Sequence, residues 1–165
     1  MRVRLTRLSD QRHVLEIERA DGTRERAELE TRSTLHHDLT HFALEEAAGL
    51  AHGFFPALAA GSTLAELAGR VDERAPQYHG ESLAVERAVA VLQRLARQDE
   101  DPAALHARLV ELAAVQGETL PPWFTRELVT RVREGLRQLL GRWRKTPYGG
   151  VLELTWTGPA AGPVP

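Results

Sequence analysis

The chain has 165 residues, of which 42% are hydrophobic, and this is enough for one compact domain with its own core. Its formal net charge of −2 argues against a dedicated nucleic-acid-binding protein, because such proteins usually carry a strong basic excess. The absence of cysteine excludes disulfides, iron–sulfur clusters, thiolate zinc sites and cysteine nucleophiles, so any metal ion would be bound by histidine, aspartate or glutamate.

The N-terminal stretch alternates charged and apolar residues, which predicts β-strands at residues 2–8, 13–19 and 23–30. Asp21-Gly22 is typical of a two-residue hairpin turn, so the three strands are expected to form an antiparallel meander. No apolar run resembles a signal peptide or approaches the roughly 20 residues of a membrane-spanning helix. We therefore expect a cytoplasmic protein without membrane association.

From about residue 34 the apolar spacing becomes helical, and we expect five helices. The first covers 34–51, with Ser33 or Thr34 as its N-cap. The second opens at STLAEL, where Thr63 and Glu66 have the spacing of a capping box. The remaining three are expected at 81–99, from Asp101 to Gly117, and at 122–145.

The alternation returns in VLELTWT at 151–157, which predicts a last strand beside the N-terminal ones. The tail GPAAGPVP at 158–165 is expected to be disordered. The sequence therefore predicts an α+β fold in a single domain, 1–157. Its sheet would combine strands from both ends of the chain, with the helical middle packed on one face.

The stretch TLHHDLTHFALEEAAGLAHGFF contains four of the seven histidines. On a helical wheel, five titratable residues share an arc of about 100°, namely His37, Asp38, His41, Glu45 and His52. His37 and His41 are four residues apart, a spacing that brings two imidazoles to one metal ion. These two histidines are the predicted ligands of a divalent metal such as zinc.

The carboxylates beside them are predicted to be catalytic. Asp38 would orient a ligand or activate water, and Glu45 would act as a base or a further ligand. His37 and Glu45 lie about 12 Å apart along a straight helix, so one ion cannot take both together with His41. The missing ligands would come from His52, His79, Glu81 or His106. HDLTH differs from the HExxH of zinc proteases, and no GxxH follows, which argues against a metalloprotease.

HDLTHFALE, followed by GLAHGFFPALAAG, resembles an uncharacterised bacterial protein family with an HDLxHFxxE helix and a downstream GF(F/W) segment. The resemblance covers about residues 34–61 and implies no established activity. The HDxxH core is also similar to the zinc motif proposed for an accessory family in ubiquinone biosynthesis, in which the glutamate lies farther along the chain.

Two functions remain open on the sequence alone. The first is a metal-dependent, hydrolase-like activity on an unknown small molecule, carried by the histidine helix. The second is a non-catalytic interaction module that forms a homodimer through its helices, with the histidine face merely polar. Arg126, Arg133, Arg137 and Arg144 form a basic ridge on the last helix, which is interpreted as a solvated face because glutamates interrupt it. No P-loop, dinucleotide-binding glycine motif or serine-hydrolase motif occurs.

Overall fold

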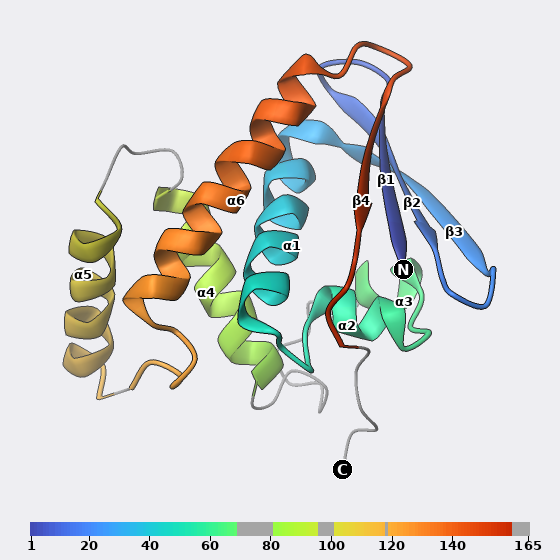
Figure 1. Ribbon diagram of the computed structural model, residues 1–165. Coiled ribbons are helices and arrows are strands. Elements are labelled where there is room, and N and C mark those ends of the chain that lie inside the picture. Colours follow the sequence, from blue (N-terminus) through green and yellow to red (C-terminus); the bar gives the residue numbers. More distant parts are fainter. Residues whose placement is uncertain (69–80, 96–100, 118, 160–165) are drawn as a thin grey trace.

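The computed structural model describes residues 1–68, 81–95, 101–117 and 119–159, and it places a four-stranded antiparallel sheet beside a group of helices (Figure 1). The strands lie in the order β3-β2-β1-β4. Their bounds are Arg2–Arg7 for β1, Arg12–Glu18 for β2, Arg24–Glu30 for β3 and Val151–Thr155 for β4. The predicted α+β fold, with three N-terminal strands and one C-terminal strand, is confirmed.

The register of the sheet follows the alternation in the sequence. Leu5 pairs with Leu15 on one side and with Leu152 on the other, and all three side chains are buried on the face that meets the helices. The opposite face carries arginine–glutamate pairs across neighbouring strands, such as Arg4–Glu16 at 3.3 Å. One face of the sheet thus belongs to the core, and the other is covered by charged side chains.

The turn between β2 and β3 is one residue longer than predicted. The amide of Arg19 donates to the carbonyl of Thr23, which leaves residues 20–22 in the loop. Within this loop, only Gly22 has a positive φ, at 86°. Three-residue hairpin loops need the left-handed conformation at one position, whereas the predicted two-residue turn would need it at Asp21 as well.

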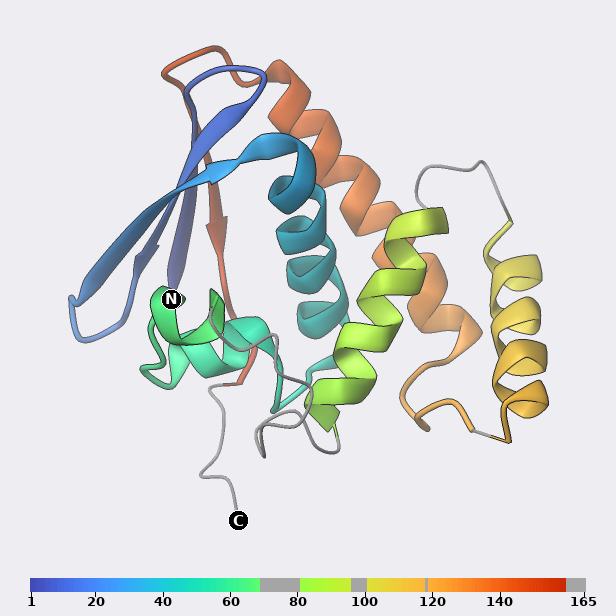
Figure 2. The same cartoon turned by 180° about the vertical axis from the view of Figure 1, so that it is seen from behind.

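The helices fill the sequence between β3 and β4. After a π-helical turn, η1, the described part of the chain has six α-helices, of which α1 and α6 lie next to the sheet and α5 lies farthest from it (Figures 1 and 2). Their bounds are Thr31–Leu35 for η1, His36–Ala48 for α1, Phe54–Ala59 for α2, Leu64–Ala68 for α3, Glu81–Leu95 for α4, Pro102–Val115 for α5 and Arg126–Lys145 for α6.

Several predicted helix ends are confirmed, and others are corrected. Thr63 and Glu66 form the capping box, with bonds of 3.1 and 2.8 Å, and Asp101 caps α5. Ser33 and Thr34 are not N-caps, because their hydroxyls donate back to the carbonyl of Glu30. The predicted last helix starts late, at Arg126, since Thr125 is its N-cap.

The short helix α2 was not predicted, because Gly53 and Pro56 mark the segment as a turn. Pro56 lies in the first turn of the helix, where a missing N–H costs no intrahelical bond. The first helix is correspondingly shorter than the predicted range, 34–51. It ends at Ala48 with Gly49 in the left-handed conformation, so His52 lies outside it.

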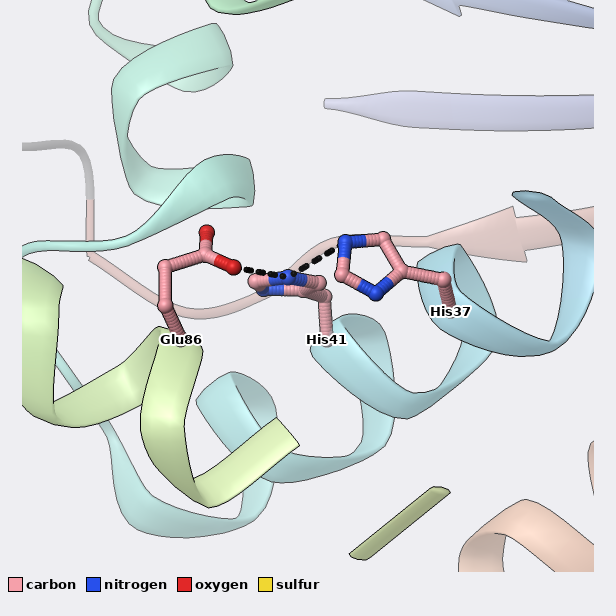
Figure 3. A group of neighbouring side chains, drawn as sticks. All are labelled: His37, His41 and Glu86. Atoms are coloured by element: carbon pink, nitrogen blue, oxygen red, sulfur yellow. Dashed lines mark hydrogen bonds and ion pairs between the residues drawn. The ribbon is translucent and has the colours of Figure 1, made fainter. Parts of the chain in front are cut away.

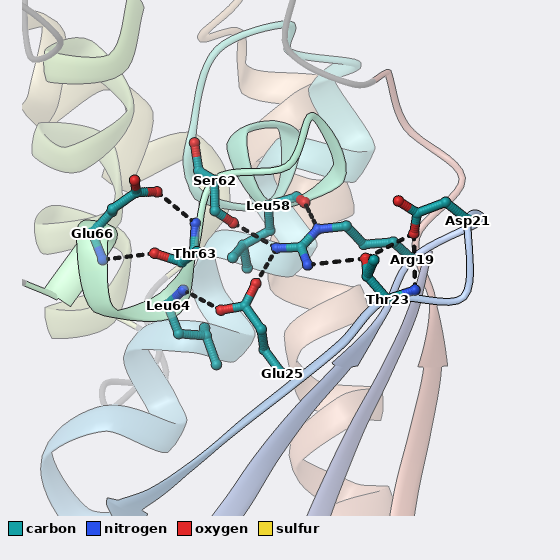
Figure 4. Close-up of polar contacts among 9 residues, drawn as sticks. All are labelled: Arg19, Asp21, Thr23, Glu25, Leu58, Ser62, Thr63, Leu64 and Glu66. Carbon is teal, nitrogen blue, oxygen red and sulfur yellow. Dashed lines mark hydrogen bonds and ion pairs between the residues drawn. The ribbon is translucent and has the colours of Figure 1, made fainter.

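A polar network fixes the α2–α3 segment against the β2–β3 hairpin (Figure 4). The guanidinium of Arg19 donates to the carbonyls of Leu58 and Ser62 at 2.7 and 2.6 Å and pairs with Glu25. Glu25 in turn accepts a bond of 2.8 Å from the amide of Leu64. The segment that follows α1 is thereby fixed to the sheet.

Parts of the sequence-based predictions lie outside the described residues, including 69–80, 96–100 and the tail from 160 onward. Within the described part, no helix combines the length and apolarity that crossing a membrane requires. The apolar side of α6 is buried in the core of its own chain through Leu128, Val132, Leu136 and Trp143.

Candidate metal centre

His37 and His41 lie one turn apart on α1, and their imidazole rings converge (Figure 3). The two Nε2 atoms are 3.2 Å apart, and the ring planes meet at 75°. His41 is fully buried, whereas His37 is partly exposed. The structure thus brings the two predicted ligands together through the same atom of each ring.

Glu86 on α4 completes this group. Its Oε2 lies 3.4 Å from Nε2 of His41. Within the described part of the chain, His37, His41 and Glu86 form the one group of three such side chains whose ligand atoms all lie within 4.8 Å of one another. Glu86 is 40% exposed, so the group is open to solvent on the α4 side.

Glu86 was absent from the sequence-based candidates, although its position in α4 carries a signal. It lies between Val85 and Val89, which are both fully buried, and three residues after the half-buried Leu83. A charged residue at the border of an apolar stripe lies beside the neighbouring element, so its side chain can reach that element while remaining partly exposed. On the same helix, Gln93 forms a side-chain hydrogen bond with His37. The two helices therefore run antiparallel, with Glu86 beside His41 and Gln93 beside His37.

Glu45 holds the other nitrogen of His41. Its Oε1 lies 2.7 Å from Nδ1 of His41, and both residues are fully buried. The same carboxylate accepts hydrogen bonds from the backbone amides of Phe54 and Phe55, at 2.9 and 2.8 Å. A Cβ placed on Gly53 would lie 2.6 Å from the carboxylate, so the glycine makes room for it. Glu45 thus orients His41 and does not join the group of three.

The charges of the carboxylates govern the protonation of this group. Burial opposes a charge on His41, but the hydrogen bonds and charges of Glu45 and Glu86 outweigh it and raise the pKa of His41 to about 10. Burial and the charge of His41 lower the pKa of His37. Without a metal ion, a proton on Nε2 of His41 therefore faces the lone pair of His37 and the carboxylate of Glu86.

Asp38 lies apart from these contacts. Its side chain is buried, and its Oδ2 has no hydrogen-bond partner among the described residues. Burial raises its pKa to about 7, against the smaller opposing effect of His41. The bond to Nδ1 of His41 comes from Glu45, so the catalytic role of Asp38 stays a prediction.

The further ligands expected from the sequence are not brought to this group. His106 lies on α5, where its Nε2 is 3.1 Å from the carbonyl of Phe124. His52 follows α1 and is not part of the group. His79 and the side chain of Glu81 lie outside the described residues.

Comparison of the chain with protein-family models, with curated proteins and with solved structures gave no match. The resemblance of residues 34–61 to an uncharacterised bacterial family stays an expectation.

Proposed function

We propose that this protein binds one divalent metal ion, with zinc the best suited, through His37, His41 and Glu86. The ion would take Nε2 of both histidines and a carboxylate oxygen of Glu86. A fourth position would stay open to water on the exposed side of Glu86. Two nitrogens and one oxygen from protein, with one open position, is the ligand set typical of a catalytic rather than a structural zinc site.

The separations of the three ligand atoms carry this proposal. Two ligands that each lie about 2.0–2.1 Å from a tetrahedral ion are about 3.3–3.4 Å from each other. The Nε2–Nε2 and Nε2–Oε2 separations of 3.2 and 3.4 Å match that edge length. The third separation, between Nε2 of His37 and the carboxylate of Glu86, is within 4.8 Å, so an ion that takes the place of the His41 proton would be within reach of all three side chains.

The surroundings of His41 support the same function. A carboxylate on the second nitrogen of a histidine ligand fixes the tautomer and strengthens the ligand, and Glu45 lies at this place. A bound zinc ion would lower the pKa of its water ligand towards neutrality, which suits hydrolysis or hydration of a small molecule. In this scheme Glu45 is a positioning residue, because its carboxylate is fully engaged by His41 and two amides.

Zinc titration of metal-free protein tests the proposal, with isothermal calorimetry for the stoichiometry. We expect one zinc ion per chain, and a Co²⁺ form with the absorption of tetrahedral coordination. His37→Ala and Glu86→Gln change side chains that are partly exposed, so both variants should fold, and each should lose binding by more than about 100-fold. His106→Gln is the matched control and should bind zinc like the parent chain.

Stoichiometric binding that survives in both ligand variants would place the metal elsewhere and contradict this assignment. If the parent chain binds no metal, the group is a partly buried hydrogen-bond network around a charged His41. The alternative function, a non-catalytic interaction module, would then be favoured.

A further inference from the structure

Strand β3 is an edge of the sheet with unused hydrogen-bonding groups. It is last in the strand order, and no strand lies on its outer side in the described part of the chain. Figures 1 and 2 show β3 at one margin of the sheet, on the far side of β1 and β2 from β4, with its C-terminal end leading into α1. A seven-residue edge strand of this kind can pair with another strand unless its side chains prevent it.

The two hydrogen bonds at the ends of the β2–β3 ladder show which residues face outward. The amide of Thr31 donates to Gln11, and the carbonyl of Thr23 accepts from Arg19. Odd-numbered residues of β3 are therefore bonded to β2, because the bonds of an antiparallel ladder alternate along each strand. The backbone groups of Arg24, Arg26, Glu28 and Glu30 point away from the sheet.

The sequence of β3, RERAELE, is complementary in charge to itself when reversed. In an antiparallel pair centred on Ala27, Arg24 lies opposite Glu30 of the second copy and Arg26 lies opposite Glu28. All four are exposed on the charged face of the sheet. Arg26 also has no ion pair with another described residue, so it is available to a carboxylate of the second copy.

Only one register suits both the backbone and the charges. A pair centred on Arg26 would place two arginines opposite each other, and a pair centred on Glu28 would place two glutamates there. The register centred on Ala27 gives four arginine–glutamate pairs with no like charges opposed. It also brings the outward residues into hydrogen-bonded pairs, with about eight backbone bonds between the copies.

We propose that two copies of this chain form a symmetric dimer by pairing their β3 strands antiparallel about Ala27. The two sheets then become one continuous eight-stranded sheet with a two-fold axis at Ala27. This dimer differs from one formed through the helices, and it does not depend on metal binding.

Charge reversal with mixing is the first test, read by analytical ultracentrifugation over micromolar to submillimolar concentrations. Arg26→Glu opposes two carboxylates at both symmetry-related cross-strand pairs, and Glu28→Arg opposes two guanidinium groups there. Each single variant should raise the dimer dissociation constant at least about tenfold.

An equal mixture of the two variants should form more dimer than either variant alone. In each mixed dimer both pairs combine one carboxylate with one guanidinium group, so mixing restores the opposite charges that either variant alone lacks. The double variant Arg26→Glu/Glu28→Arg is the decisive comparison, because it carries both changes in one chain. That chain restores opposite charges at both pairs and should dimerise like the parent.

Arg131→Glu on α6, an exposed change of the same charge, is the matched control and should leave the dimer dissociation constant unchanged. A double variant that dimerises no better than the two single variants would contradict the register centred on Ala27.

Amide exchange followed by NMR is a second test that does not rely on charge. The amides of residues 24, 26, 28 and 30 should become protected as the concentration rises, whereas residues 25, 27 and 29 should be protected at every concentration. Arg26→Pro removes only an outward amide and should abolish the dimer while the chain stays folded. The proposal is wrong if the parent chain stays monomeric at submillimolar concentration. It is equally wrong if a dimer forms that Arg26→Glu and Arg26→Pro leave intact.

Discussion

Glu45 has two structural roles, because it holds the segment after α1 in place and also orients the ring of His41. Its carboxylate is fully buried, and such a charge is tolerated only where hydrogen bonds and an opposite charge compensate its lost hydration. His41 supplies one bond, and the amides of Phe54 and Phe55 supply the others. The same side chain therefore anchors the segment after α1 and fixes the ring of a proposed metal ligand.

Glu45→Gln should affect both roles. The amide NH₂ group would face a donor instead of accepting its bond, which we expect to lower the free energy of unfolding by about 1–3 kcal/mol. Zinc affinity should fall about 10–100-fold, because the histidine loses its orienting carboxylate. Urea unfolding with and without zinc measures both effects. Glu46→Gln, one residue along and outside the group, should change neither, and equal losses in the two variants would contradict this role.

The local part of the site could be predicted from the sequence, and the distant part could not. His37 and His41 are joined by helical spacing alone, which is visible in any window of five residues. Glu86 meets them only because α4 packs antiparallel on α1, a contact between segments far apart in the chain. Neither the spacing nor the composition around Glu86 contains that information, although its place beside buried valines marks it as facing another element.

The junction between α1 and α2 is built around a glycine. The position of a Cβ on Gly53 coincides with the carboxylate of Glu45, at 2.6 Å from its Cδ and Oε1. The far end of a glutamate usually moves aside easily. Here it is buried and held by three hydrogen bonds, so relief by movement would cost those bonds.

Gly53→Ala should therefore destabilise the chain. We expect a loss of about 1–3 kcal/mol in the free energy of unfolding from overpacking, together with weaker zinc binding as the carboxylate shifts. Thermal unfolding and zinc titration of the same sample are the measurements. An unchanged melting temperature with unchanged zinc affinity would show that Glu45 is not confined as described.

Gly135→Ala offers a comparison in which the same substitution should stabilise. Gly135 lies inside α6, where its new Cβ would meet only the Cβ of Ala43, at an ordinary 3.9 Å. Removing a glycine from a helix interior gains about 0.5–1 kcal/mol. We expect a higher melting temperature by calorimetry, and a fall would indicate that the contact between α1 and α6 has no room for a methyl group.

At the level of elements, prediction succeeded where a side chain marks a helix end. Asp101 before Pro102 and Thr63 before Glu66 are capping signals with local causes, and both are present. It was wrong at Ser33 and Thr34, whose hydroxyls bond to the preceding carbonyl of Glu30 while the chain enters α1 through a π-helical turn. A six-residue helix such as α2 has no apolar period long enough to detect, and it is held in place by Glu45 and the network around Arg19.

The interface between the sheet and α6 contains a buried histidine. His13 on β2 is fully buried, its Nδ1 is 3.2 Å from the hydroxyl of Thr31, and its ring packs edge-on against Trp143. Its Nε2 has no hydrogen-bond partner among the described residues. Burial, assisted by the charge of Arg12, lowers the pKa of His13 to about 4.

This histidine should make the whole fold sensitive to acid. The unfolded chain binds a proton at His13 from about pH 6.5 downward, whereas the folded chain binds it only near pH 4. The free energy of unfolding should therefore be nearly unaffected above pH 7, and titration of His13 should lower it by about 3 kcal/mol between pH 7 and pH 4. His13→Asn should be less stable at pH 7 but lose less on acidification. Denaturant unfolding across this range tests it, and parallel pH profiles for the two chains would refute the assignment.

Strand β1 lies in the interior of the sheet, yet its two neighbours come from opposite ends of the chain. Val3 pairs with Ile17 and also with Leu154, which the ribosome adds about 150 residues later, several seconds to half a minute at ordinary rates of synthesis. Until then β1, which occupies the interior of the finished sheet, has one edge uncovered. A nascent chain that stalls before β4 would display that strand to chaperones or to other nascent chains. We therefore expect that removing β4 causes aggregation during expression, a larger effect than the loss of five residues alone would suggest.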